Sequence, residues 1–181
     1  MTEKNRLKEL VHHICYKCGG KNELGATKLN KILWFADSLA YKQTGKSITG
    51  SRYKKLQHGP VPFEINSVLK ELENEGKILV YKHEYFGLPK KTFLLLEHPL
   101  DEIFSRDELE FVDLLTAEIC GGHTAKSISE LSHDIVWEAA SMGEEIPLSA
   151  VLATDEAILN EEDIAWANAV VSRIQAEGTA K

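Results

Sequence analysis

The clearest helical pattern of hydrophobic and polar positions lies in the first half of the chain, between Thr27 and Thr44. Hydrophobic residues recur there at steps of three and four, which is the spacing of one buried helix face. That face consists of Leu29, Ile32, Leu33, Ala36, Leu39 and Ala40. Trp34 and Tyr41 fall on the opposite side, so the pattern predicts a helix that is either sandwiched inside the fold or covered by a partner.

Further patterns predict helices and strands on both sides of this segment. Thr27 is the expected N-cap of the central helix, and the capping boxes that begin at Ser105 and Ser127 predict two more helix starts. The sequence Gly59-Pro60-Val61-Pro62 predicts a sharp corner that opens another helix. The predicted helices cover 7–18, 27–44, 63–76, 105–122, 127–133, 149–157 and 161–177, with a short strand within 46–57 and a hairpin formed by 78–85 and 92–96.

These elements indicate a mainly α fold of the α+β class, with a small β-hairpin. The order over residues 5–96 (helix, helix, short strand, helix, hairpin) is that of a winged helix-turn-helix, with further helices packed on it. In a winged helix the third helix enters the DNA major groove. Here its solvent-facing positions carry four acidic residues and one lysine, which would repel phosphates. A DNA-binding regulator of prophage or mobile-element origin is therefore the alternative function, and nucleic acid is not the expected partner.

The net charge of -7 conceals a strong asymmetry along the chain. Residues 1–98 contain 17 Lys and Arg against 10 Asp and Glu, whereas residues 99–181 contain 4 against 18. Two halves of opposite sign are expected to attract each other within one fold, and a basic nucleic-acid face is the alternative.

Composition also limits the compartment and the chemistry. No apolar run approaches the ~20 residues of a membrane span, and the N-terminus lacks the apolar core of a signal peptide. We therefore expect a cytoplasmic protein without a membrane partner, whose three cysteines are reduced. The sequence contains no phosphate-binding loop, nucleophile elbow or metalloprotease motif. It therefore predicts neither an enzyme nor a cofactor.

One pattern resembles a metal site. Cys15 and Cys18 are spaced as a Cys-x-x-Cys pair, and Cys120 and His123 as a Cys-x-x-His pair, which together give a Cys3His zinc ligand set. However, Cys15 lies in the apolar stripe of the first helix, where a free cysteine packs as a small hydrophobe. The expectation is therefore that the protein holds no metal, with structural zinc as the alternative.

Two blocks in the first half of the chain carry a family resemblance. The run Lys28-Leu29-Asn30-Lys31-Ile32-Leu33-Trp34-Phe35 and the turn His58-Gly59-Pro60-Val61 resemble the motifs of the Panacea domain. This is the SocA-like antitoxin family, which is also known as phage-associated GepA-like proteins. A weaker third block matches at Leu131-Ser132-His133 and Trp137, and continues to Gly143-Glu144-Glu145-Ile146. The resemblance covers residues 7–152, and residues 153–181 are expected to form a helical extension that packs on the same domain.

The resemblance implies an antitoxin without enzymatic activity that neutralises a toxin by direct binding. It also implies delivery of the toxin to a protease as one route of neutralisation. The family partners diverse toxins, so the resemblance leaves the toxin open, and the sequence leaves a homodimer open as well. The motif residues with expected structural roles are Lys28, Leu29, Gly59, Pro60 and Val61.

The candidate toxin-binding residues are the large and cationic side chains near the central helix, because aromatic and arginine anchors dominate many interfaces. They are Lys31, Trp34, Tyr41, Arg52 and His58. For Trp34 and Tyr41 the alternative is an ordinary second core layer, covered by Phe111, Leu115 or the last helix. For His58 the alternative is a structural role in which it holds the turn. The acidic residues Glu144, Glu145, Asp155, Glu156, Glu161, Glu162 and Asp163 form a second candidate surface, for a basic toxin.

Overall fold

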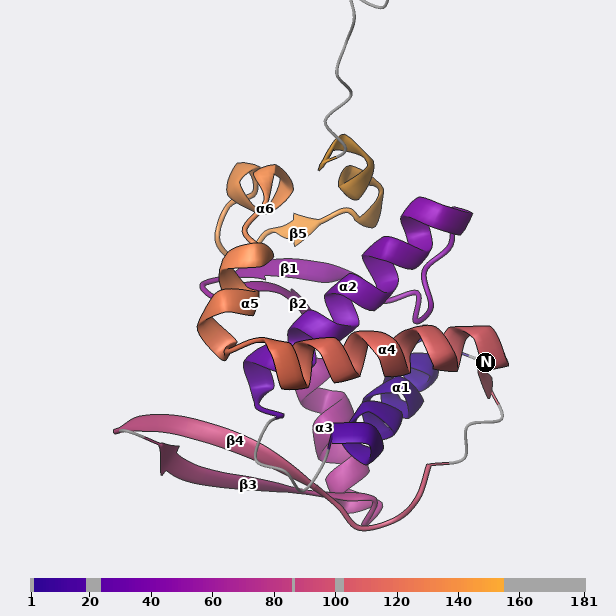
Figure 1. The fold of residues 1–181 in the computed structure, drawn as a ribbon, viewed down its shortest axis with the longest axis vertical. Helices are drawn as coiled ribbons and strands as arrows, with labels where there is room; N and C mark the ends of the chain where they lie inside the picture. Colours follow the sequence, from indigo (N-terminus) through magenta and orange to yellow (C-terminus); the bar gives the residue numbers. More distant parts are fainter. Residues whose placement is uncertain (1, 19–23, 86, 100–102, 155–181) are drawn as a thin grey trace, which may run out of the picture.

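The computed structural model describes residues 2–18, 24–85, 87–99 and 103–154 and confirms a mainly α fold of the α+β class (Figure 1). The first half contains α1 (Glu3–Cys18), α2 (Ala26–Thr44), β1 (Tyr53–Leu56), β2 (Gly59–Pro62), α3 (Ile65–Asn74), β3 (Ile78–Tyr85) and β4 (Leu88–Leu95). The second half contains α4 (Arg106–Gly122), α5 (Ala125–Leu131), α6 (Ile135–Ala139), β5 (Glu145–Ile146) and the 3-10 helix η2 (Leu148–Thr154). The predicted helix at 161–177 lies outside the described residues. Within the described residues, no helix is both long and apolar enough to cross a membrane.

Helix α2 passes through the middle of the molecule and is buried on both sides (Figure 1). One side joins the main core, which α1, α3, α4 and the base of the β3–β4 hairpin complete. The other side carries Trp34 into a second, smaller core. Of the two alternatives that the pattern left open, the structure shows the helix sandwiched inside the fold. Of the residues expected to cover Trp34, Phe111 and Leu115 do not, and the predicted last helix lies outside the described residues. Trp34 packs against Tyr53 and Ile146 of the small sheet and against α6 and η2, rather than against Phe111 or Leu115.

Beside α2 lies a three-stranded antiparallel sheet in the order β2-β1-β5. Leu56 pairs with Gly59 across a two-residue turn, so Gly59 to Pro62 forms a strand rather than only a corner. Prolines are tolerated because β2 lies at the edge of the sheet, where a missing N–H breaks no ladder. Strand β5 pairs with the other edge of β1 and brings residues 145–146 beside residues 53–54, a contact between distant segments that no local pattern indicated.

A buried carboxylate anchors the loop that leads from α2 into β1. Asp37 accepts hydrogen bonds from the backbone N–H (2.8 Å) and the hydroxyl of Thr49. The Tyr53 hydroxyl lies 2.8 Å from Asp37 Oδ2 and 2.9 Å from the carbonyl oxygen of Leu33. Burial raises the pKa of the Asp37 carboxyl, while the bonds to Thr49 and Tyr53 counteract that effect. These bonds connect the second core to the middle of α2.

Two predicted helix starts were wrong. Helix α2 begins after Gly25, without a side-chain cap, so Thr27 lies inside the helix. Helix α5 begins after Thr124, whose hydroxyl accepts from the backbone N–H of Ser127, so Ser127 is the third residue of the helix rather than its cap. The capping box at Ser105 is confirmed. The hairpin is also confirmed, although β4 begins four residues earlier than predicted because Leu88 to Lys91 pair with β3.

The C-terminal ends of α1 and α4 are joined by a disulfide between Cys18 and Cys120, whose Cα atoms lie 6.8 Å apart. This pairing differs from the expectation of three reduced thiols. It arises because α1 and α4 pack side by side, which the spacing of the cysteines along the chain does not reveal. Cys15 remains a free, buried thiol, and burial raises its pKa to about 12.

Reduction of this bond is expected to lower the thermal midpoint of unfolding by about 10 °C or more. The bond closes a loop of 102 residues, and a loop of that size constrains the unfolded chain by about 4–5 kcal/mol. The measurement is thermal unfolding by circular dichroism with and without a phosphine reductant, together with a count of free thiols in denaturant. The double variant C18S/C120S is the control and should not respond to reductant. Equal midpoints for the wild-type protein would show that the bond does not stabilise it.

Candidate functional site

Three segments that are distant in the sequence meet at the turn between β1 and β2. Lys31 reaches it from α2, and its Nζ donates to the carbonyl oxygen of Pro60 at 3.3 Å. Ser129 reaches it from α5, and its hydroxyl donates to the carbonyl oxygen of His58 at 2.9 Å. Backbone carbonyls of the turn are therefore held from both sides by buried polar side chains.

Gly59 occupies the centre of this junction. Its φ of +101° is a conformation that side chains with a Cβ rarely adopt. A Cβ at this position would also overlap Lys31 Nζ and Ser132 Oγ. The turn therefore requires glycine both for its backbone conformation and for the close approach of α2 and α5.

Aromatic and cationic side chains cover the outer side of the junction. The rings of His133 and Trp137 are stacked, with centroids 3.7 Å apart, and Trp137 Nε1 donates to the carbonyl oxygen of Leu56 at 3.2 Å. The Lys55 amine lies 4.0 Å from the centroid of the Trp137 ring and donates to the carbonyl oxygen of Ala140 at 2.9 Å. These contacts attach α6 to the end of β1, so that α5, α6 and the β1–β2 hairpin lie side by side (Figure 1).

The same region exposes large apolar side chains. Leu131 is 61% exposed and Ile135 is 65% exposed, and Leu56 is exposed at the end of β1. We call this region the turn surface, which consists of Lys55, Leu56, His58, Leu131, His133, Ile135 and Trp137. Exposed apolar groups beside aromatic and cationic groups are typical of surfaces that bind another protein.

Basic side chains are concentrated beneath and around the turn surface. Lys31 is only 1% exposed, and burial lowers the pKa of its amine to about 7. Burial, together with the nearby cationic groups of Lys31, His58 and Lys55, lowers the pKa of His133 below its usual value. Within the described part of the chain, no salt bridge involves Lys31, Lys55, His58 or His133.

The five residues predicted to contact a partner do not lie on one surface. Lys31 and Trp34 are buried, so in this structure they support the surface from below and are not exposed on it. His58 is exposed on the turn surface. The alternative expectation was that the His58 side chain holds the turn. In the structure the His58 backbone carbonyl holds it, by accepting a hydrogen bond from the Ser129 hydroxyl.

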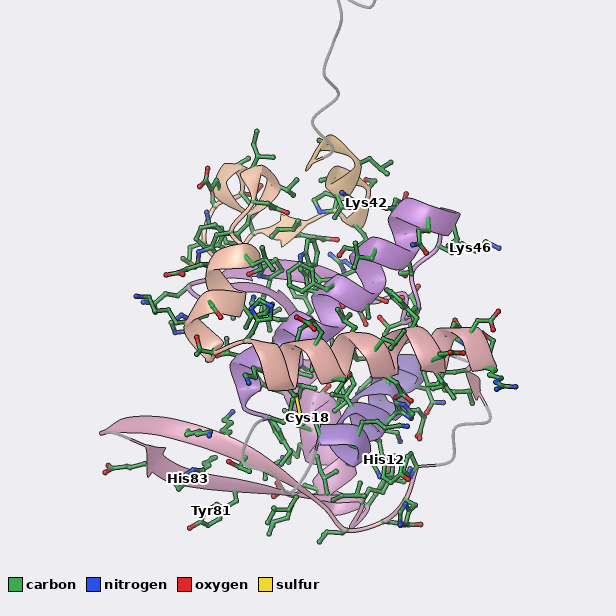
Figure 2. All side chains as sticks on the ribbon, viewed as in Figure 1. His12, Cys18, Lys42, Lys46, Tyr81 and His83 are labelled. Atoms are coloured by element: carbon green, nitrogen blue, oxygen red, sulfur yellow. A yellow bond between two sulfur atoms is a disulfide. The ribbon has the colours of Figure 1, made fainter. Side chains whose placement is uncertain are left out.

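Tyr41 and Arg52 lie in a different place, around an open hollow of about 430 Å³ at the C-terminal end of α2. Arg52 Nε donates to Glu145 Oε1 at 2.9 Å, and Arg52 Nη2 donates to Glu145 Oε2. The guanidinium group of Arg52 also lies 5.3 Å from the Phe63 ring centroid. Lys42 and Lys46 extend from the same end of α2 (Figure 2).

The motif residues with predicted structural roles are buried or nearly so. Lys28 donates to the carbonyl oxygen of Cys120 at 2.9 Å and so satisfies the last turn of α4. Leu29 lies in the main core. Gly59, Pro60 and Val61 are buried residues of β2. Local patterns did not indicate Lys55 or Ser129 as parts of the site, because the backbone carbonyls to which they donate lie 85 and 71 residues away, at Ala140 and His58.

The four residues of the alternative zinc set are not arranged as a metal site. Cys18 and Cys120 are bonded to each other, Cys15 is buried, and His123 Nδ1 lies 3.3 Å from the Ser127 hydroxyl. No group of three or more His, Cys, Asp and Glu residues in the described ranges is arranged to hold a metal ion. Of the acidic candidate surface, Glu145 pairs with Arg52 and Glu144 accepts from the backbone N–H of Ser141, while residues 155–163 lie outside the described residues.

The fold and the turn surface together define a small α+β domain that presents an apolar, cation-rich surface. Comparison with known proteins is consistent with this class. The family model described as "Antitoxin SocA-like, Panacea domain" matches residues 29–138. No curated protein and no solved structure matches the chain. The chain therefore belongs to the SocA-like antitoxin family that the Panacea domain defines. The match extends from α2 to α6 and so contains every element of the turn surface.

Proposed function

We propose that this protein is an antitoxin that neutralises a toxin by stoichiometric binding, and that the toxin contacts the turn surface. The main support is that the three sequence blocks that resemble the family meet at Gly59. The first block contributes Lys31, the second His58 to Pro60, and the third Ser132 to Trp137. The residues above this junction are exposed, aromatic, apolar or cationic. Such residues usually dominate the energy of protein interfaces.

The test is co-expression with the product of the neighbouring gene, followed by growth assays and affinity purification. The wild-type protein should restore growth and co-purify with that product in a fixed ratio. Immunoblots of the toxin separate two routes of neutralisation, because the toxin level stays constant if binding blocks it and falls if binding delivers it to a protease. A harmless neighbouring product, or one that neither binds nor is rescued, contradicts the proposed function.

The variant Leu131→Glu tests the location of the interface. Leu131 is 61% exposed at the end of α5, so its replacement should leave the fold intact. A carboxylate in the apolar part of the turn surface should weaken toxin binding by about tenfold or more. The matched control is Leu114→Glu, because Leu114 is 68% exposed but lies on α4. Equal binding by the two variants, measured by calorimetry, would show that the toxin binds elsewhere.

Tyr41 and Arg52 are proposed as a separate, second region of toxin contact at the C-terminal end of α2. Their position beside an open hollow supports this proposal. Because the Arg52–Glu145 pair is solvent-exposed, it contributes little to stability, and Arg52→Ala therefore tests binding with little effect on the fold.

The observed contacts of α3 do not favour DNA binding. Glu71 of α3 and Glu75, which caps its C-terminal end, form salt bridges with Lys4 and Lys8 of α1, so these lysines face carboxylates rather than phosphates. A gel shift with DNA from upstream of the gene tests this alternative, and we expect no shift at physiological salt.

A further inference from the structure

The basic side chains of the turn surface, together with Lys31 beneath it, come from separate elements. Lys31 extends from α2, Lys55 from β1, His58 from the β1–β2 turn and His133 from the segment after α5. Among the carboxylates, Glu130 of α5 raises the pKa of His133 but is outweighed by burial and by the three cationic groups. The carboxylate of Asp134 caps α6, where it accepts from the backbone N–H of Trp137 at 2.9 Å. Glu138 of α6 is exposed, and its backbone carbonyl oxygen lies 3.3 Å from the Lys55 amine.

Lys31 has unusually few partners for a buried amine. An ammonium group can donate three hydrogen bonds, whereas the described contacts of Lys31 Nζ provide one acceptor, the Pro60 carbonyl oxygen at 3.3 Å. A buried charge without a counter-charge is costly. A negative group placed over His58 and His133 would therefore be stabilised by Lys31 from below as well as by the exposed cations.

We propose that the toxin segment that binds the turn surface is acidic, with carboxylates over the cluster of Lys31, Lys55, His58 and His133 and with apolar side chains against Leu131 and Ile135. This proposal rests on the proposed function and names the chemistry of the partner. The apolar part distinguishes a peptide segment from nucleic acid, because a phosphate backbone offers nothing to cover exposed leucine and isoleucine side chains.

Such binding is coupled to proton uptake. In the free protein, burial keeps the pKa of Lys31 near 7. Burial, together with the neighbouring groups of Lys31, His58 and Lys55, keeps the pKa of His133 below its usual value. Carboxylates placed beside these groups favour their protonated forms and raise both pKa values. The complex therefore holds more protons than the free partners, and affinity increases as the pH falls from 8 to 6.

The test uses the full-length protein and two synthetic peptides, acetyl-EELWEELE-amide and its counterpart in which every glutamate is replaced by lysine. Binding is followed by two-dimensional NMR, with the indole N–H of Trp137 as reporter. The acidic peptide should shift the signals of Trp137, His58 and His133 and should bind about fivefold or more tightly at pH 6 than at pH 8. The lysine peptide should produce no such shifts. Equal shifts from the two peptides, or none from either, overturn the proposal.

Charge-reversal variants locate the effect. His58→Glu changes an exposed side chain, and it should weaken binding of the acidic peptide by about fivefold or more. Lys54→Glu is the matched control, because Lys54 precedes Lys55 on β1 and its amine lies over Phe63, 5.1 Å from the ring centroid, on the other face of the strand. Equal losses in the two variants would overturn the proposed location.

The outcome also separates this proposal from the proposed function. If the toxin binds through Leu131 but the acidic peptide does not bind, the acidic partner is wrong and the antitoxin function stands. If the acidic peptide binds as described but no neighbouring product is neutralised, the charge selectivity stands and the antitoxin function is wrong.

Discussion

Replacing Gly59 with alanine is expected to destabilise the protein by about 3 kcal/mol or more and to abolish binding at the turn surface. The φ of +101° disfavours any residue with a Cβ by about 1–2 kcal/mol. Overlap of the new methyl group with Lys31 and Ser132 adds about 1–3 kcal/mol, because both side chains are buried and have little room to move. The free energy of unfolding is measured by urea titration with circular dichroism.

Gly45→Ala provides the control for this experiment. Gly45 also has a positive φ, of +72°, but no atom lies within 4 Å of the position that its Cβ would occupy. It should therefore lose only the conformational part, about 1 kcal/mol, and keep binding. If the two variants lose equal stability, the close approach of α2 and α5 at Gly59 has no energetic importance.

The second large effect is expected for Asp37→Ala, at about 3 kcal/mol or more. The substitution removes the acceptor of the backbone N–H and hydroxyl of Thr49 and leaves the Tyr53 hydroxyl with only the Leu33 carbonyl. Each buried polar group without a partner costs about 1–3 kcal/mol. Loss of this anchor should also loosen the connection between α2 and β1. Hydrogen exchange of the Thr49 and Tyr53 amides measures this directly.

Asp37→Asn distinguishes the hydrogen bonds from the charge. The amide keeps one acceptor oxygen and offers an N–H₂ to the two hydroxyls, so this variant should retain most of the stability. Burial raises the pKa of Asp37, so the folded state binds a proton more tightly than the unfolded state. This group therefore makes stability fall as the pH rises between its unfolded and folded pKa values. Asp37→Asn should remove that pH dependence, and an unchanged profile would show that Asp37 does not titrate in this range.

The asymmetric charge of the two halves is partly explained by contacts between them. Arg6 of α1 donates to Glu108 of α4 at 2.8 Å, and Lys17 pairs with Asp113 of α4 at 2.6 Å. Arg52 pairs with Glu145 across the small sheet. These pairs support the expectation that the basic and acidic halves attract each other within one fold, although each pair is partly exposed and so contributes little alone.

Local patterns were sufficient wherever an element depends on its own residues. The stripe of α2, the capping box at Ser105 and the β3–β4 hairpin were predicted because periodicity, side-chain capping and strand propensity act over a few residues. The wrong helix start at Ser127 also came from a local pattern, because two residues close together fit the requirements of a cap. Thr124 and Ser127 are both able to cap, and the path of the chain after α4 decides which of them does.

The candidate site was predicted only in part, for a different reason. His58 was recognised because a histidine before Gly-Pro marks a turn, and it is exposed there. Lys31 and Trp34 were assigned to the surface because charge and size are typical of interfaces, but the small sheet, α5 and α6 cover them. Burial depends on which distant segments pack on a residue, and a single sequence contains no direct record of that packing.

From the sequence alone follow the mainly α fold, a central helix that is hydrophobic on both sides, and the resemblance to the SocA-like antitoxins, because each depends on residue type and spacing within short segments. Only the tertiary structure decided that α5 and α6 fold back over the β1–β2 turn, that Cys18 meets Cys120, and that buried and exposed cations gather around Gly59. These features join residues that are 29 to 102 positions apart. They exist only once the chain has brought those residues together.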